Sequence, residues 1–307
     1  MTAEAPASIP SPRQLAVQRR RESLRRFVAD FRTHRSGMAG LAILLVFVTM
    51  ALVAPVLFPG ESLDITKNLS NPVWSPPSRT FWLGTDSNGI SVLAQIFWGA
   101  RVSLAVGFAA TAMAVVIGTL VGIASGHYRS GFGLALERFT DWFLVIPFVP
   151  LAIVIITLRG GGLLTTIVII GVTSWAGTAR LVRAQTLSVE GRPYLERARV
   201  LGTGDWLQMT RHILPNVFPL VLANATLTVS IAILTETTLA FLGLGDPARV
   251  SWGTMLDAAY NNAAIIRGAW WWVLPPGLCV VTIVLSFTLI GRTLEVIFNP
   301  QLERDRT

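Results

Sequence analysis

Six apolar segments of about 20 residues recur along the chain, and they constrain its fold more than any other feature. A helix of that length crosses the roughly 30 Å of hydrocarbon in a bilayer. It also satisfies its own backbone hydrogen bonds, as lipid requires. Charged residues make up only 14% of the sequence, whereas soluble domains carry about 25%. The sequence therefore predicts an all-α polytopic membrane protein, with six transmembrane helices near 38–58, 102–125, 139–158, 163–182, 217–239 and 271–290.

The apolar segments divide the chain into an N-terminal tail at 1–37, a transmembrane domain at 38–298 and a C-terminal tail at 299–307. The first twelve residues are rich in Ala, Pro and Ser, which predicts disorder. Four apolar residues further on share one helical face: Leu24, Phe27, Val28 and Phe31. Arginines surround them, as is typical of a helix lying on a membrane surface. A solvated basic tail is the alternative.

Two prolines, Pro147 and Pro150, fall inside the third apolar segment. Proline removes a helical hydrogen bond and clashes with the preceding turn, so we expect a kink in this helix. The kink serves either as part of a gate or as a simple packing feature.

Lysine and arginine are distributed unevenly between the loops. With the N-terminus placed in the cytoplasm, 19 of the 25 lie on that side, in 1–37, 126–138, 180–215 and the C-terminal end from Arg292 onward. The six on the outside are Lys67, Arg79, Arg101, Arg159, Arg249 and Arg267. The positive-inside rule therefore predicts that both termini are cytoplasmic. Topology accounts for the net charge of +8, so no nucleic-acid partner is expected.

Two larger pieces then face the outside, at 59–100 and 241–270. Both are rich in Pro, Gly and Trp, which favours ordered loops at a membrane interface. Trp74, Trp82 and Trp252 either contact a partner outside or anchor the loops in the interface.

The largest internal cytoplasmic loop carries helix signals of its own. Pro193 fits a first helical position and Gly202 a C-terminal stop, which predicts a helix over 193–201. Asp205 is expected to cap a second helix together with Gln208, and Pro215 to bend or restart the chain where the fifth span begins. Three interpretations compete: a solvated loop, a DNA-reading helix-turn-helix and a docking element for a cytoplasmic partner. Tethering to the bilayer at both ends disfavours DNA binding.

The stretch "ERARVLGTGDWLQMTRHILP" resembles the EAA loop of ABC importer permeases, E-A-A-x3-G-x9-I-x-L-P. The matching residues are Glu196, Ala198, Gly202, Leu214 and Pro215. Arg197 replaces the middle alanine and His212 stands at the isoleucine position.

Two further motifs narrow the resemblance to the dipeptide/oligopeptide/nickel-type permeases, over about residues 35–300. "LGTDSNGISVLAQIFWGARVSL" resembles that family's outer-loop motif through Leu83, Gly84, Thr85, Asp86 and Gly89. Ile90 and Ser91 stand where Arg-Asp is usual. "LAFLGLGDPARVSWGTML" resembles a third motif, which includes Trp252 and Gly253.

The resemblance implies one permease subunit of an ATP-driven importer in the bacterial cytoplasmic membrane. Such a subunit pairs with a second, related permease and binds two cytoplasmic ATPases. It receives a peptide-like solute from an extracytoplasmic binding protein. The short cytoplasmic helix would be the coupling helix, with Glu196, Ala198 and Gly202 at the ATPase contact. Helix-dipole pairing and simple capping are the alternative roles of these residues.

No ATPase site is expected in this chain. A P-loop needs a lysine before Ser or Thr, and the only lysine is Lys67, in "DITKNLS". The chain is therefore expected to be no enzyme and to bind no cofactor, with ATP and Mg²⁺ used by the partner ATPases. The single Cys279 excludes an intrachain disulfide, and the three histidines are far apart in sequence, so no metal site is expected.

An ion-coupled secondary transporter is the main rival, and a membrane scaffold or sensor is a second one. Secondary transporters usually show ionisable residues at the midplane and inverted repeats. Glu236 is the one candidate, near the outer end of the fifth span. We expect it to act in gating or subunit contact, or else to reach the outer headgroups. The cargo stays open among dipeptides, oligopeptides, nickel complexes and other small solutes.

Overall fold

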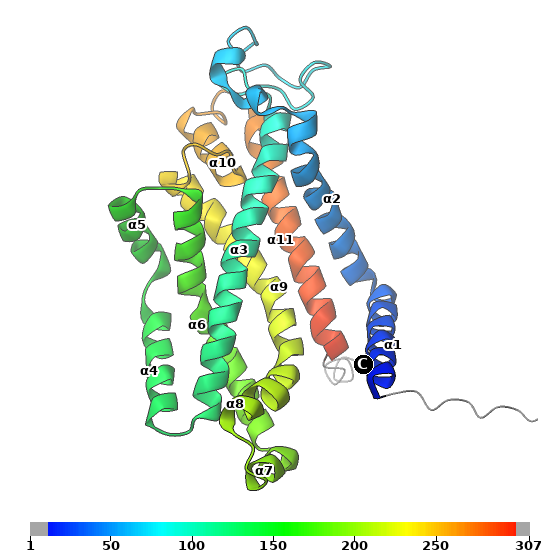
Figure 1. Ribbon diagram of the computed structural model, residues 1–307. Helices are drawn as coiled ribbons and strands as arrows, with labels where there is room; N and C mark the ends of the chain where they lie inside the picture. Colours follow the sequence, from blue (N-terminus) through cyan, green and yellow to red (C-terminus); the bar gives the residue numbers. More distant parts are fainter. Residues whose placement is uncertain (1–11, 299–307) are drawn as a thin grey trace, which may run out of the picture.

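The computed structural model describes residues 12–298, and its regular structure is helical (Figure 1). The helices are α1 (Pro12–Thr33), α2 (Arg35–Leu57), α3 (Val92–His127), α4 (Gly131–Val145), α5 (Phe148–Arg159), α6 (Leu163–Glu190), α7 (Pro193–Val200), α8 (Asp205–Gln208), α9 (Leu214–Leu239), α10 (Trp252–Asn261) and α11 (Trp270–Phe298). Within 12–298, strand-like pairing is limited to one isolated bridge between Thr85 and Ser91. The all-α prediction is confirmed.

Among residues 12–298, five helical segments are long and apolar enough to cross a bilayer. They are α2, α3, α6, α11 and a continuous stretch, Asp205–Leu244, that contains α9. The pair α4 and α5 passes the same test only when taken together, with a bend of 85° between its halves. Counting that pair as one broken span gives the six expected crossings.

The break in the third span lies at Pro147. The residue before a proline is pushed out of the helical region, and Ile146 accordingly has an extended ψ of 122°. The expected kink is therefore confirmed at Pro147. Pro150 contributes no kink, because it lies in the first turn of α5, where a backbone N–H has no helical partner to lose.

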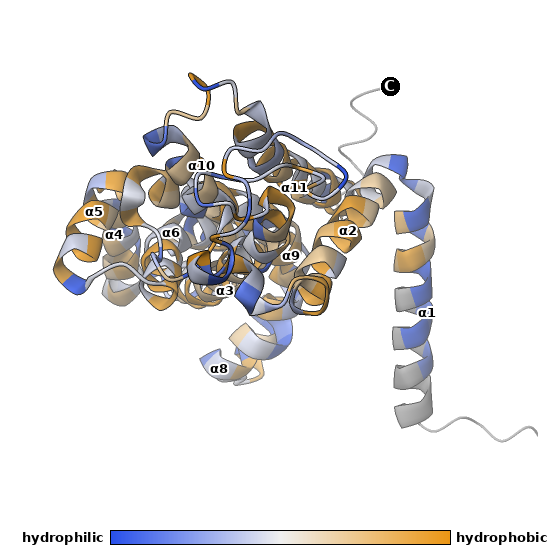
Figure 2. Cartoon of the chain, turned by 90° about the horizontal axis from the view of Figure 1, so that it is seen from above, coloured by the Kyte–Doolittle hydropathy of each residue, from blue (hydrophilic) through white to orange (hydrophobic). Residues whose placement is uncertain are grey.

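The bundle has two structured ends (Figure 1). One end, here named the α10 end, holds the loop between α2 and α3 together with α10. The other, the α7 end, holds α7, α8 and α1. Figure 2 looks along the bundle and shows α1 lengthwise, to the side of the bundle beyond α2, so α1 runs roughly at right angles to the spans.

The orientation of α1 agrees with the predicted surface helix, but part of its apolar face is used inside the protein. Phe27 and Phe31 pack against Ile290 and Leu294 of α11, while Val28 is exposed. The side chain of Leu24 and the tails at 1–11 and 299–307 lie outside the described residues.

A stripe of three glycines brings α3 and α6 into close contact. Gly118, Gly122 and Gly126 are spaced four residues apart, so they share one face of α3. A Cβ atom on Gly122 would lie 2.6 Å from the carbonyl oxygen of Ala179, and one on Gly126 would lie 2.7 Å from the Cβ of Thr186. Small residues at such spacing let helix backbones approach each other in membranes. The stripe leads directly to His127, the last residue of α3, and places it beside the end of α6.

Candidate functional site

Helix α7 begins and ends where its sequence predicts, to within one residue. Pro193 occupies the first helical position and Glu196 lies in the first turn. At the other end Gly202 has a φ of +77°. The N–H of Gly202 donates to the carbonyl of Arg199, and the N–H of Thr203 to that of Ala198. This is the Schellman arrangement that a glycine after a helix supports.

Two faces of α7 have different environments. Leu195 is fully buried, in a cluster with Ile213 and Val217. Arg199, one turn later, lies on the same face. Glu196 and Val200 lie on the outward face and are exposed. The helix is therefore anchored along one side and open along the other.

The open side of this loop is unusually apolar. Val200 is 88% exposed, Leu201 83% and Trp206 74%. Ala198 is half-buried, and a Cβ atom on Gly202 would meet nothing within 4 Å. Contiguous exposed apolar side chains typically mark a site of interaction with another molecule.

The predicted capping pair at α8 is wrong. Gly204 is the N-cap residue and Asp205 the first helical residue, and no side chain caps the helix. The Asp205 carboxylate instead lies 3.5 Å from His127 Nε2. The amide of Gln208 donates to the carbonyl of Thr203 at 2.6 Å. A contact across the fold for Asp205 and a local backbone contact for Gln208 have replaced the capping box that the sequence favours.

The chain then passes from α8 into α9 through a π-helix, Met209–Ile213, without leaving the helical state. Pro215 is exposed in the first turn of α9, so the expected restart takes the form of a π turn followed by a tolerated proline. Leu214 packs at the edge of the cluster that buries Leu195. These two motif residues join the loop to α9.

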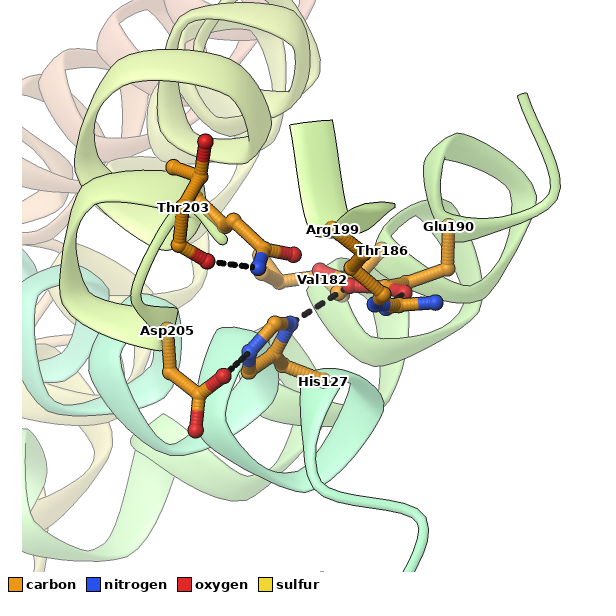
Figure 3. Close-up of polar contacts among 8 residues, drawn as sticks. His127, Val182, Thr186, Glu190, Arg199, Thr203 and Asp205 are labelled. Atoms are coloured by element: carbon orange, nitrogen blue, oxygen red, sulfur yellow. Dashed lines mark hydrogen bonds and ion pairs between the residues drawn. The ribbon is translucent and has the colours of Figure 1, made fainter. Parts of the chain in front are cut away.

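Behind α7, four charged or ionisable residues form a charge cluster, defined as His127, Glu190, Arg199 and Asp205 (Figure 3). His127 Nδ1 lies 2.5 Å from Glu190 Oε1. Arg199 Nη2 donates to the other oxygen, Glu190 Oε2. With the Asp205 contact, the cluster joins the ends of α3 and α6 to α7 and α8.

The charge cluster satisfies a carboxylate that is completely shielded from solvent. The side chains of Glu190 and His127 are 0% and 3% exposed, whereas that of Arg199 is 44% exposed. Burying an unpaired charge costs a free energy of roughly several kcal/mol, so both carboxylate oxygens of Glu190 need partners. Beside the cluster lies a hollow of about 280 Å³, lined by His127, Tyr128, Arg129, Ser130, Arg199 and Asp205.

At the α10 end, the outer-loop motif builds the turn that starts α3. Thr85 Oγ1 donates to the carbonyl of Pro72 at 2.7 Å, and Gly84 and Gly89 have φ values of +72° and +75°. Leu83 packs against the large apolar core at this end of the bundle.

Asp86 is only 4% exposed. Its carboxylate accepts from the N–H groups of Asn88 and Ile90, at 2.8 and 2.9 Å, and from the Gln95 side chain at 2.7 Å. Burial raises the pKa of this carboxyl above its usual value despite those hydrogen bonds. Asp86 therefore supports the loop from inside and offers no surface contact.

Trp252 and Gly253 open α10, a helix that the sequence interpretation treated as part of a loop. Ser251 caps it in a reciprocal capping box with Thr254. Trp252 is 0% exposed and donates its indole N–H to the carbonyl of Ile96 at 3.2 Å. It is therefore a core residue, and both interpretations of Trp252, contact with an outside partner and interfacial anchor, are wrong.

Glu236 lies near the C-terminal end of α9 and is 3% exposed. It accepts a hydrogen bond from Ser103 of α3 at 3.0 Å. Its carboxylate is enclosed by the protein, so the alternative in which it reaches the outer headgroups is wrong.

Sequence reasoning missed the charge cluster. His127 and Glu190 are separated by 63 residues, and neither belongs to a motif that the sequence made prominent. One signal was present: three glycines at four-residue spacing run directly into His127. That stripe predicts a close helix contact at the level of this histidine.

Fold and site together define a multi-pass helical membrane protein. It carries a short anchored helix at one end and a folded cap at the other, formed by the loop between α2 and α3, by α10 and by the turn before α11. Residues 118–304 match the family described as binding-protein-dependent transport system inner membrane component. Residues 23–72 match the N-terminal transmembrane domain of oligopeptide transport permease C.

Curated relatives match the chain over most of its length. The di/tripeptide transport system permease protein DppC of Pseudomonas aeruginosa is 33% identical, covering 91% of this chain and 93% of the relative. The glutathione transport system permease protein GsiD of Pectobacterium atrosepticum is 32% identical, covering 92% and 91%. The oligopeptide transport system permease protein OppC of Bacillus subtilis is 32% identical, covering 89% and 88%.

The chain belongs to the family of binding-protein-dependent transport system inner membrane components. It is a permease component of an ABC transport system and not an enzyme. The resemblance drawn from the three sequence motifs is thereby confirmed, and the secondary-transporter and scaffold alternatives fall away.

Proposed function

We propose that this chain is one of two related permease subunits of an ATP-driven importer in a bacterial inner membrane. Two ATPase subunits bind at the α7 end, in the cytoplasm, and an extracytoplasmic binding protein delivers cargo at the α10 end. Both termini are cytoplasmic. The cargo is a peptide-like small solute, as the names of the relatives indicate.

The outward face of α7 carries this proposal. Its exposed Val200 and Leu201 supply apolar area, and Glu196 beside them supplies a negative charge for a basic group of the ATPase. Leu195 holds another face of the helix in the core. A short helix that is anchored on one side and open on the other can transmit a push from a partner into the bundle.

The proposal assigns ATP and Mg²⁺ to the partner subunits. The only lysine, Lys67, lies in the loop at the α10 end and pairs with Glu61 at 2.7 Å. A phosphate-binding loop needs a lysine at the phosphates, so this chain supplies no such loop.

The cap at the α10 end offers exposed apolar side chains to a second partner. Trp82 is exposed on the loop before α3, and Ile265 and Ile266 on the turn before α11. Since Asp86 and Trp252 are buried beneath this surface, the exposed residues are the ones that we expect to meet the binding protein.

Co-purification with the ATPases tests the role of α7. Gly202→Trp places a bulky side chain on the docking surface, and Glu196→Lys reverses its charge. Both variants are expected to lose the ATPases while inserting at normal levels. The dipole penalty of a lysine in the first turn, about 0.3–1 kcal/mol, is too small to explain such a loss.

Two substitutions at the α10 end serve as matched controls. Gly268 also has a positive φ, +75°, and a Cβ atom added there would meet nothing within 4 Å, so Gly268→Trp introduces comparable backbone strain. Glu61→Lys reverses an exposed charge. Both controls should retain the ATPases. Normal ATPase retention in both Gly202→Trp and Glu196→Lys would show that α7 is merely a loop.

A further inference from the structure

The charge cluster is the connection between α7 and the two most tightly packed helices of the bundle. His127 is the last residue of α3 and Glu190 the last residue of α6. Arg199 reaches Glu190 from α7, and Asp205 reaches His127 from the start of α8. Figure 3 shows the His127 ring lying between the carboxylates of Glu190 and Asp205.

The position of the charge cluster distinguishes it from the other ion pairs of this end within residues 12–298. Arg180–Asp141 and Arg183–Glu137 join α6 to α4, both at 2.7 Å, and leave α7 out. In the charge cluster, by contrast, Arg199 immediately precedes the exposed Val200. The buried Glu190 carboxylate therefore bonds to the residue directly before Val200, on the outward face of α7.

Helices α3 and α6 form a stiff support for this connection. The glycine stripe allows their backbones to touch, and closely packed helices move together more readily than they separate. Leu195 adds an apolar attachment next to the ionic one, in a cluster that includes Val182 of α6 and Ile123 of α3. A displacement of α7 therefore acts on both helices through two adjacent contacts.

We propose that His127, Glu190, Arg199 and Asp205 are positioning residues that make α7 and the adjoining ends of α3 and α6 move as one body during transport. This inference rests on the proposed docking of α7 to an ATPase. The buried ionic contact inside the permease then passes a movement of the docked α7 to α3 and α6. Its four residues are not among those that define the EAA-loop motif.

A distance measurement between α7 and α3 tests the inference in the assembled transporter. Cys279 is the single cysteine, so a Cys279→Ser background accepts spin labels at Tyr194→Cys on α7 and Leu120→Cys on α3, both exposed positions. Distances are measured without nucleotide and with ADP, Mg²⁺ and vanadate trapped on the ATPases. With the native cluster, we expect one narrow distribution that is the same in both states.

Glu190→Gln should keep the ATPases bound but broaden the distribution and shift it between the two nucleotide states. Arg199→Met should do the same, and it remains informative if Glu190→Gln fails to accumulate, because Arg199 is half-exposed. Arg199→Lys keeps a cation at the same place and should restore the narrow, invariant distance. Glu137→Gln, which removes an ion pair of α4 and α6, is the matched control and should change nothing.

Failure of the inference and failure of the proposed function give different results. A narrow and unchanged distance in both Glu190→Gln and Arg199→Met would overturn the inference and leave the cluster as a fold-stabilising contact only. Absence of the ATPases from the unsubstituted transporter would contradict the proposed function itself, and the inference with it.

Discussion

At the scale of single residues, Glu236 is the buried acid whose role the sequence left open. It accepts from Ser103 and borders a cavity of about 10 Å³, together with Asp246, Arg249 and Ser251. It therefore links α9 to α3 and to the segment that leads into α10. A role in gating or subunit contact stays a prediction.

Glu236→Gln should slow uptake while the complex assembles normally, because the amide keeps the shape and the acceptor for Ser103 but removes the charge. Glu236→Ala should also lower stability by about 1–3 kcal/mol, since it leaves the Ser103 hydroxyl unsatisfied. Uptake rate and membrane levels are measured together. Thr238→Ala, at an exposed position two residues on, is the control. Normal uptake in Glu236→Gln at normal levels would exclude a functional charge.

Asp86 predicts a pH dependence of stability. Burial raises the pKa of its carboxyl in the folded protein above the ordinary 3.8. The folded state therefore holds this proton to higher pH than the unfolded state does, and the contribution to stability is lost as pH rises through the folded pKa. Asp86→Asn removes this titration. In detergent, the Tm of the native protein minus that of Asp86→Asn should fall as pH rises from 3.8; a constant or rising difference would contradict the assignment.

Residues with local roles were predictable, and those with long-range roles were not. Gly202 and Thr203 end α7 through bonds to the carbonyls of Arg199 and Ala198, all within five residues, so the local sequence was sufficient. The buried state of Thr85 depends on Pro72 and on Trp271, whose indole donates to the Thr85 carbonyl at 3.2 Å. No local sequence pattern predicts the contact with Trp271, which is 186 residues away from Thr85.

At the scale of elements, two expected features differ in the structure. Asp205 left its expected capping role because His127 lies within reach across the fold. The segment containing Trp252 forms α10, because Ser251 and Thr254 cap it locally, a signal that the sequence interpretation overlooked. The apolar spans themselves were predictable, because length and hydropathy decide them without reference to distant residues.

The contact between α3 and α6 predicts that Gly122→Ala destabilises the protein. Its new methyl group would lie 2.6 Å from a backbone oxygen of α6, and overpacking of this kind costs about 1–3 kcal/mol. Gly177→Ala adds the same group to α6 where nothing lies within 4 Å, so it should be neutral or slightly stabilising. Thermal unfolding in detergent compares the two. Equal stability of both variants would show that the stripe does not set the helix contact.

At the scale of the whole molecule, the bundle separates two surfaces with different tasks. The helices carry the chain back and forth between the α7 end and the α10 end (Figure 1). The exposed apolar residues of α7 lie at one end and those of the cap at the other. The proposed function requires that each end meets its own partner.

Site-specific photo-cross-linking tests this requirement most directly. A photoreactive amino acid replaces Val200 on α7 or Ile266 in the cap, both 88% exposed, in cells that produce the complete transporter. We predict an adduct with the ATPase from position 200 and none from position 266, where an adduct with the binding protein is expected instead. An ATPase adduct from position 266, or none from position 200 in a fully assembled complex, would contradict the proposed division of the two ends.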